Sequence, residues 1–176
     1  RKTPDPKDGE PLRILLSPAK NMRVDTDCMP CESLPFFLPQ ASALLRRLRD
    51  MDYAGLKSLW NCNDAIASLQ YRRLETMDLE HNLTPAILSY VGIQYQYMAP
   101  QVFETGYFDY VQEHVRILSG LYGVLRPLDA VVPYRLEMQA KLCTPRGKNL
   151  YEFWGTRLAR QAMEGDNVLI DLASEE

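Results

Sequence analysis

The feature that most constrains the fold is the segment from Leu118 to Met138, in which large apolar side chains are interspersed with glycine and proline. It reads Leu-Ser-Gly-Leu-Tyr-Gly-Val-Leu-Arg-Pro-Leu-Asp over 118–129 and closes with Pro-Tyr-Arg-Leu-Glu-Met over 133–138. A solvated loop would not carry so many apolar side chains, and a helix would not carry two glycines and two prolines. Four charged residues lie within it: Arg126, Asp129, Arg135 and Glu137. We interpret the segment as a shaped, largely buried stretch that builds a site.

The composition is that of an ordinary globular protein: 176 residues, 46% hydrophobic and 24% charged, enough for one domain with its own core. No apolar run reaches about 18 residues, so we expect neither a membrane span nor a membrane partner. Residues 1–11 are polar and rich in proline, unlike a signal peptide. We therefore expect a flexible tail over 1–11 and one cytoplasmic domain over 12–176. The missing initiator Met indicates a fragment or a processed product.

The charge is unevenly distributed along the chain. The formal net charge is −3, yet residues 42–74 hold six basic and three acidic side chains, and residues 115–160 hold eight and three. Residues 75–114 hold six acidic side chains and no Lys or Arg. The fold could therefore present one basic face despite its acidic total. The alternative is that these charges cancel in salt bridges.

The cysteines do not indicate a metal site. Cys28-Met-Pro-Cys31 is a C-x-x-C motif, but a structural zinc site needs a second pair, and the two histidines, His81 and His114, are far away in sequence. A redox motif would follow a buried strand, which the polar segment before Cys28 is not. We interpret Cys28 and Cys31 as incidental thiols of a reducing cytoplasm, and we predict no metal and no cofactor. Direct iron binding has no clear ligand set.

The spacing of apolar residues indicates short strands mixed with helices. Leu12–Leu16 and Val115–Leu118 are β-prone, and a buried-type strand is expected within 165–172. Helices are expected where apolar residues recur every three or four positions or where a capping residue precedes them: 39–49, 53–60 after Asp52, from Asn63 or Asp64 to about 77, from Thr84-Pro85 to about 92, 107–114 and 149–163. The pattern predicts a single α/β domain (mixed α+β), with a mixed sheet flanked by helices.

Residues 56–73 are expected to form a helical hairpin around the turn Trp60-Asn-Cys-Asn-Asp64. Such a unit can bind duplex phosphates through backbone N–H groups at a helix N-terminus. The candidate DNA contacts in it are Lys57, Asn63, Arg72 and Arg73. Against this reading, the turn has no glycine, and Asp64 would repel a phosphate unless it caps backbone donors. The alternative is an ordinary hairpin that packs against a core.

Ser17-Pro-Ala-Lys20 stands at the end of the first expected strand. Loops at the carboxyl ends of strands are where α/β proteins gather ligand-binding groups. Lys20 could contact an anionic ligand, and Ser17 could donate a hydrogen bond to it. The alternative is a simple turn with an exposed lysine.

Together these motifs resemble the YaaA family of bacterial peroxide stress response proteins. The series that carries the resemblance runs in order from about residue 12 to the last residue: 12–20, 118–129, 133–138, Gly147-Lys148, Tyr151-Glu-Phe-Trp-Gly155 and Leu172-Ala-Ser174. The resemblance implies a cytoplasmic protein that limits iron-dependent oxidative damage under peroxide. It also implies DNA binding, through a helix-hairpin-helix element and a positively charged cleft in an unusual α/β fold.

Carried over to this chain, the family's Ser-Pro-Ala-Lys motif falls on Ser17–Lys20, and the hairpin element falls on about 56–74. The later motifs supply Arg126, Arg135 and Lys148. The chain departs from the family pattern at 92–98, and at Ala65, where a basic residue is usual. Family members continue beyond Ser174, so we expect a truncated YaaA-like domain over 12–176, incomplete at its C-terminus.

The first functional hypothesis is sequence-tolerant binding of double-stranded or branched DNA. In this hypothesis the hairpin lies beside a cleft lined by Lys20, Arg126, Arg135 and Lys148. Its affinity would come from phosphate neutralisation and would fall steeply with salt.

Two other hypotheses remain open. One is an enzyme that acts on a nucleotide or a nucleic acid, with Lys20, Tyr134 and Glu137 as candidate catalytic residues and the two arginines of the cluster, Arg126 and Arg135, as anion clamps. The other is a scaffold with a different partner, in which Arg126–Asp129 and Arg135–Glu137 are internal ion pairs.

Overall fold

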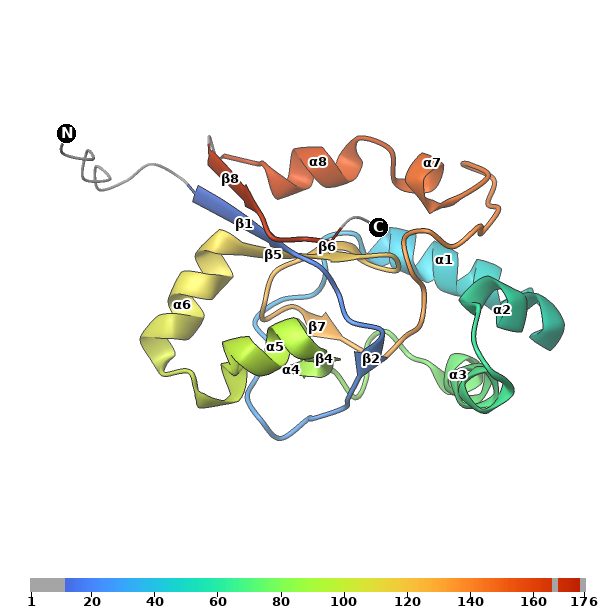
Figure 1. Ribbon diagram of the computed structural model, residues 1–176, viewed down its shortest axis with the longest axis horizontal. Helices are drawn as coiled ribbons and strands as arrows, with labels where there is room; N and C mark the ends of the chain where they lie inside the picture. Colours follow the sequence, from blue (N-terminus) through green and yellow to red (C-terminus); the bar gives the residue numbers. More distant parts are fainter. Residues whose placement is uncertain (1–11, 166–167, 175–176) are drawn as a thin grey trace.

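The centre of the protein is a four-stranded mixed sheet. The computed structural model describes residues 12–165 and 168–174. The sheet has the order β6-β5-β1-β8, with β1 (Leu12–Leu16) parallel to both β5 (Val115–Ser119) and β8 (Val168–Asp171). The strand β6 (Gly123–Leu125) runs antiparallel to β5 as its hairpin partner. The predicted mixed α/β class is therefore confirmed (Figure 1).

Two short strand pairs lie outside the four-stranded sheet. The strand β2 (Asn21–Met22) pairs with β4 (Tyr90–Val91), and β3 (Thr84–Pro85) pairs with β7 (Ala130–Val131), both antiparallel. The β3–β7 pair joins the middle of the chain to the 118–138 segment.

Helices surround the sheet (Figure 1). Helix α8 packs against β6, whereas α6 packs against β1 and β5. A small cluster of Leu15, Val124 and Ala162 lies under α8, and the main core lies on the other side of the sheet. The helices are α1 (Leu38–Arg49), α2 (Tyr53–Trp60), α3 (Asp64–Thr76), α4 (Ala86–Ser89), α5 (Ile93–Met98), the 3-10 helix η1 (Pro100–Val102), α6 (Thr105–His114), α7 (Leu150–Trp154) and α8 (Arg157–Ala162). Among the described residues, none of these helices has the length and apolar character needed to cross a membrane.

Three predicted elements differ from the structure. The helix expected from Thr84-Pro85 to about 92 is only the four-residue α4, because Thr84-Pro85 pairs with β7 and Tyr90 is extended and pairs with Met22. The helix expected over 149–163 is divided into α7 and α8 at Gly155, whose φ is +53°. The strand β8 was expected to be buried, but its side chains are exposed, since within the described residues only β1 pairs with it.

The 118–138 segment is largely buried as expected, with Arg126 as its one exposed residue. Both glycines are required by geometry. A Cβ at Gly120 would overlap the carbonyl group of Leu136, and Gly123 has a φ of +79°, which favours glycine. Trp154 fixes the same turn, because its indole Nε1–H donates to the Gly120 carbonyl at 3.0 Å. The predicted shaping of this segment by glycine is therefore confirmed.

Candidate functional site

Lys20, Arg135 and Glu137 meet at one edge of the sheet. Lys20 follows the carboxyl end of β1, and its Nζ lies 3.0 Å from Oε2 of Glu137. Nη2 of Arg135 lies 3.4 Å from the other carboxylate oxygen, Oε1. The carboxylate therefore holds two cations that are more than a hundred residues apart in sequence. Arg135–Glu137 is an internal ion pair, as one of the hypotheses expected, but it also fixes Lys20 in place.

Arg126 lies apart from these residues. It follows β6, which runs antiparallel to β5 with Leu125 opposite Ile117 and Gly123 opposite Ser119. Arg126 is therefore near the amino end of β5, whereas Lys20 lies at the carboxyl end of the neighbouring β1. The side chain of Arg126 borders a separate groove of about 230 Å³. The cleft expected from sequence thus divides, with Arg126 at the opposite end of the sheet.

Asp129 is a structural carboxylate of the 118–138 segment. Its Oδ2 accepts the backbone N–H of Arg126 at 2.8 Å, and its Oδ1 accepts the hydroxyl of Ser33 at 2.5 Å. Only 3% of Asp129 is exposed, and this burial raises the pKa of its carboxyl above the usual 3.8, opposed by those two hydrogen bonds. Asp129 therefore joins the loop that carries Ser33 to the 118–138 segment, through the hydroxyl of Ser33 and the backbone N–H of Arg126.

The raised pKa of Asp129 predicts an unusual pH dependence. Because the folded state binds this proton more tightly than the unfolded state, the carboxyl contributes most to stability below pH 3.8, and the contribution falls as pH rises through the folded pKa. Asp129→Asn has no such titration. The loss of unfolding free energy caused by Asp129→Asn should therefore be larger near pH 4 than at pH 7, as measured by urea unfolding at both values. An equal loss at both values would contradict the assignment.

The two helices of the expected hairpin are present, and their predicted caps are confirmed. The carboxylate of Asp52 accepts the N–H of Gly55 at 2.8 Å at the start of α2, and the side chain of Asn63 accepts the N–H of Ile66 at 2.9 Å at the start of α3. Asn61 has a left-handed φ of 44°, which allows the tight turn. Leu56 on α2 and Ala67 on α3 are fully buried, so the hairpin is anchored in the core.

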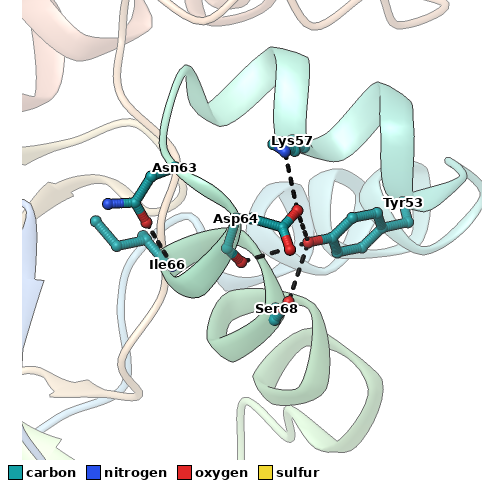
Figure 2. A network of polar contacts seen from close by, with 6 residues as sticks. All are labelled: Tyr53, Lys57, Asn63, Asp64, Ile66 and Ser68. Carbon is teal, nitrogen blue, oxygen red and sulfur yellow. Dashed lines mark hydrogen bonds and ion pairs between the residues drawn. The ribbon is translucent and has the colours of Figure 1, made fainter.

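Figure 2 shows the polar network that closes this hairpin. Asp64 Oδ1 lies 2.8 Å from Nζ of Lys57 and accepts the hydroxyl of Tyr53 at 2.8 Å. The hydrogen bond and charge of Lys57 lower the pKa of Asp64, and the same contact raises the pKa of Lys57. Asn63 rather than Asp64 caps the helix. The ammonium group of Lys57 forms an ion pair with Asp64, and the carboxylate of Asp64 points toward Lys57 and Tyr53.

A cavity of about 490 Å³ separates the hairpin from the segment that follows β7. We call it the hairpin cavity. Its walls come from the end of α2 and the turn (Ser58, Leu59, Trp60, Asn61), from Met51 and Gly55, and from Arg135, Glu137, Gln139, Ala140 and Lys141.

Two buried donors border the hairpin cavity without an acceptor. Among the described residues, neither Nε1 of Trp60 nor Nε of Arg135 has a hydrogen-bond partner. Trp60 is 5% exposed, and the side chain of Arg135 is 10% exposed. A buried N–H without an acceptor costs about 1–3 kcal/mol, but both nitrogens are covered by protein atoms. The positively charged group of the wall that a ligand reaches directly is the exposed Lys141.

The remaining DNA-binding candidates are not among the described residues that line the hairpin cavity. Arg72 is exposed and Arg73 half-buried on α3, and Lys148 is exposed before α7. The backbone N–H of Lys148 donates to the carboxylate of Glu152 at 2.8 Å. The structure thus adds Trp60 and Lys141 to the candidate site. The only sequence signal that could have indicated Lys141 is its place in the basic block over 115–160.

The three catalytic candidates share only a very small space, although Glu137 also lines the hairpin cavity. The hydroxyl of Tyr134 is buried and hydrogen-bonded to Tyr90 at 2.8 Å and to Ser119 at 2.6 Å. The cavity that Tyr134 shares with Lys20 and Glu137 measures about 20 Å³, which holds about one water molecule. Tyr134 therefore acts as part of a buried hydroxyl network.

The cysteines are free thiols. Cys28 is exposed and Cys31 half-buried, and burial raises the pKa of both. Within residues 12–165 and 168–174, no group of three or more His, Cys, Asp or Glu side chains is placed to hold a metal ion.

Comparison with known proteins gives a consistent result. A family model described as peroxide stress protein YaaA matches residues 12–176. A UPF0246 protein of Pediococcus pentosaceus is 48% identical over 165 residues, and one of Desulfitobacterium hafniense is 51% identical over 165 residues. A UPF0246 protein of Agathobacter rectalis is 50% identical over the same length. Each match covers 94% of this chain and 66% of the relative, so the chain spans just under two thirds of the length of these relatives.

Proposed function

Since the chain belongs to the peroxide stress protein YaaA family, we propose that it binds DNA in the response to peroxide and so limits iron-dependent oxidative damage. The contact surface in this proposal is the hairpin cavity and its rim. DNA binding would be tolerant of sequence, because the groups available are suited to phosphate rather than to base edges.

The observation that carries the proposal is the convergence of donors and positive charge at the hairpin cavity. Arg135 and Lys141 line it opposite the hairpin turn, and the one carboxylate among the lining residues is Glu137, which lies 3.4 Å from Nη2 of Arg135. Phosphate oxygens are acceptors and carry the charge that Arg and Lys attract. Lys20, held by Glu137 at 3.0 Å, extends the positive rim along the sheet edge.

The hairpin adds a second element, which lies outside the residues that line the cavity. The N-terminus of α3, a helix of 13 residues, presents backbone N–H groups with partial positive charge. Asp64 would oppose a phosphate there, but Lys57 lies 2.8 Å from its carboxylate, which Figure 2 shows directed toward Lys57 and Tyr53. This arrangement reduces the objection that the sequence raised against a phosphate-binding hairpin.

A salt titration tests the proposal. Binding of a short fluorescent duplex, measured by anisotropy, should weaken linearly in log–log form with salt, with a slope of about 0.9 per phosphate neutralised. Lys141→Gln should lower the slope by about 0.9 and weaken duplexes of different sequence alike. Arg160→Gln, an exposed position on α8, is the matched control and should leave the slope unchanged. Absence of duplex binding at low salt would refute the proposal.

A further inference from the structure

A second cavity, of about 290 Å³, lies at the carboxyl ends of the parallel strands. We call it the strand-end cavity. Its walls come from the last residues of β1 and β5, from residues that follow β1, β5 and β8, from Met138, and from α7 and α8, and it shares no lining residue with the hairpin cavity. The DNA-binding proposal does not use it.

The strand-end cavity stands at the topological switch point of the sheet. From β1 the chain continues to β5 on one side, and it later returns to β8 on the other side of β1 (Figure 1). Ligands of open α/β sheets bind outside the carboxyl ends of the strands at such a point. Ser17 and Ser174 follow the two strands there, and their hydroxyl oxygens lie 2.9 Å apart.

The walls of the strand-end cavity are apolar and contain flat or polarisable side chains. Tyr151, which is 49% exposed, and Met138 line it, Trp154 backs it with only 1% of its surface exposed, and among the described residues that form its walls none is charged. Aromatic rings favour stacked or edge-on contact with other rings, and the Met thioether packs well against aromatic groups. A charged ligand would lose its hydration here without a partner. The walls therefore suit a neutral aromatic ring.

The polar groups are confined to the serine pair. The hydroxyl of Ser17 accepts the backbone N–H of Ser174 at 2.7 Å. One hydroxyl of the pair donates to the other, and the second keeps its hydrogen to donate to a ligand. The position of Ser17 is fixed, because its carbonyl accepts the hydroxyl of Tyr95 at 2.7 Å. Trp154 is likewise held by its hydrogen bond to Gly120. The cavity is thus formed by restrained groups, with apolar walls and one hydrogen-bonding edge.

We propose that the strand-end cavity binds a neutral aromatic heterocycle of nucleobase or nucleoside size. A heterocycle of this kind has a flat face for the exposed ring of Tyr151, an edge that can pack against the wall formed by Met138 and Trp154, and polar edge atoms for the serine pair. The volume of about 290 Å³ stands at the lower end of the range of about 300–1,000 Å³ found for ligand pockets, which favours a small ligand.

The test is calorimetric titration of the chain with adenosine, guanosine, cytidine and uridine, each up to about 1 mM. At least one nucleoside should bind. Ala159→Phe, which places a ring in the cavity from an exposed position on α8, should weaken that binding by about tenfold or more. Ala43→Phe, at an exposed position on α1, is the matched control and should leave it unchanged. Ser174→Ala, also exposed, should weaken it severalfold without disturbing the fold.

Tryptophan fluorescence locates the bound nucleoside independently of the calorimetric titration. The chain has two tryptophans, so Trp60→Phe leaves Trp154 as the single indole, and bound nucleoside should change its fluorescence. The proposal is overturned if no nucleoside binds, or if binding occurs but neither Ala159→Phe nor the Trp154 signal responds. Duplex binding is measured separately, so failure here leaves the DNA proposal standing.

Discussion

Arg135→Gln is expected to weaken duplex DNA binding by about ten- to hundredfold, whereas Arg126→Gln is expected to leave it nearly unchanged. Arg135 lines the hairpin cavity, and a hydrogen bond between a charged group such as its guanidinium and a phosphate contributes about 1.5–3 kcal/mol. Arg126 borders a different groove at the other end of the sheet. The two residues have the same charge and belong to the same segment, so they form a matched pair. Fluorescence anisotropy of both variants with the same duplex measures the difference.

The structure indicates that Arg135→Gln will fold. Glu137 keeps a cation after the substitution, because Lys20 remains 3.0 Å from its carboxylate. Thermal unfolding monitored by circular dichroism checks this point. Arg135→Lys separates charge from geometry, since lysine retains the charge but lacks the planar guanidinium, and it should restore only part of the affinity. Equal losses in Arg126→Gln and Arg135→Gln would mean that the hairpin cavity is not the DNA-binding surface.

Gly120→Ala is expected to lower the free energy of unfolding by about 3 kcal/mol or more. The added Cβ would overlap the carbonyl oxygen of Leu136, which is backbone and cannot rotate away as a side chain would. Overpacking of a buried site costs about 1–3 kcal/mol, and more where backbone must shift. The substitution would also disturb the hydrogen bond from Trp154 to the Gly120 carbonyl. Urea unfolding monitored by circular dichroism gives the value.

Gly106→Ala is the matched control for this prediction. Gly106 lies in the first turn of α6, and a Cβ there would meet no atom within 4 Å. Since alanine favours the helical conformation, this variant should be as stable as the parent or more stable by about 0.5–1 kcal/mol. If Gly120→Ala had the same free energy of unfolding as Gly106→Ala, the 118–138 segment would tolerate more movement than its packing implies.

Local sequence patterns predicted many of the elements correctly. The apolar spacing at 39–49 corresponds to α1 (Leu38–Arg49), and the caps Asp52 and Asn63 mark the starts of α2 and α3. These signals are local, since a cap and the N–H it accepts are three residues apart. The helix expected over 149–163 was wrong at its centre, because Gly155 adopts a left-handed φ that spacing alone does not reveal.

Signals that depend on distant contacts were not available from the sequence. Thr84-Pro85 has the residues of a helix start, but its pairing with β7, more than 40 residues later, makes it a strand. Trp60 was expected at the end of a helix and the start of a turn, and the cavity that it lines arises where α2 faces the segment after β7.

By itself, the sequence determined that the 118–138 segment is buried and shaped by glycine, and it determined the two-helix hairpin and the family. Each of these depends on residue types a few positions apart or on an ordered series of motifs. Only the tertiary structure decided which charges act together. Lys20 and Arg135 share Glu137, while Arg126 is carried to the opposite end of the sheet, because β6 runs antiparallel to β5. The direction and register of strand pairing are set by contacts along the whole chain, and they place the charges of one continuous motif at two separate sites.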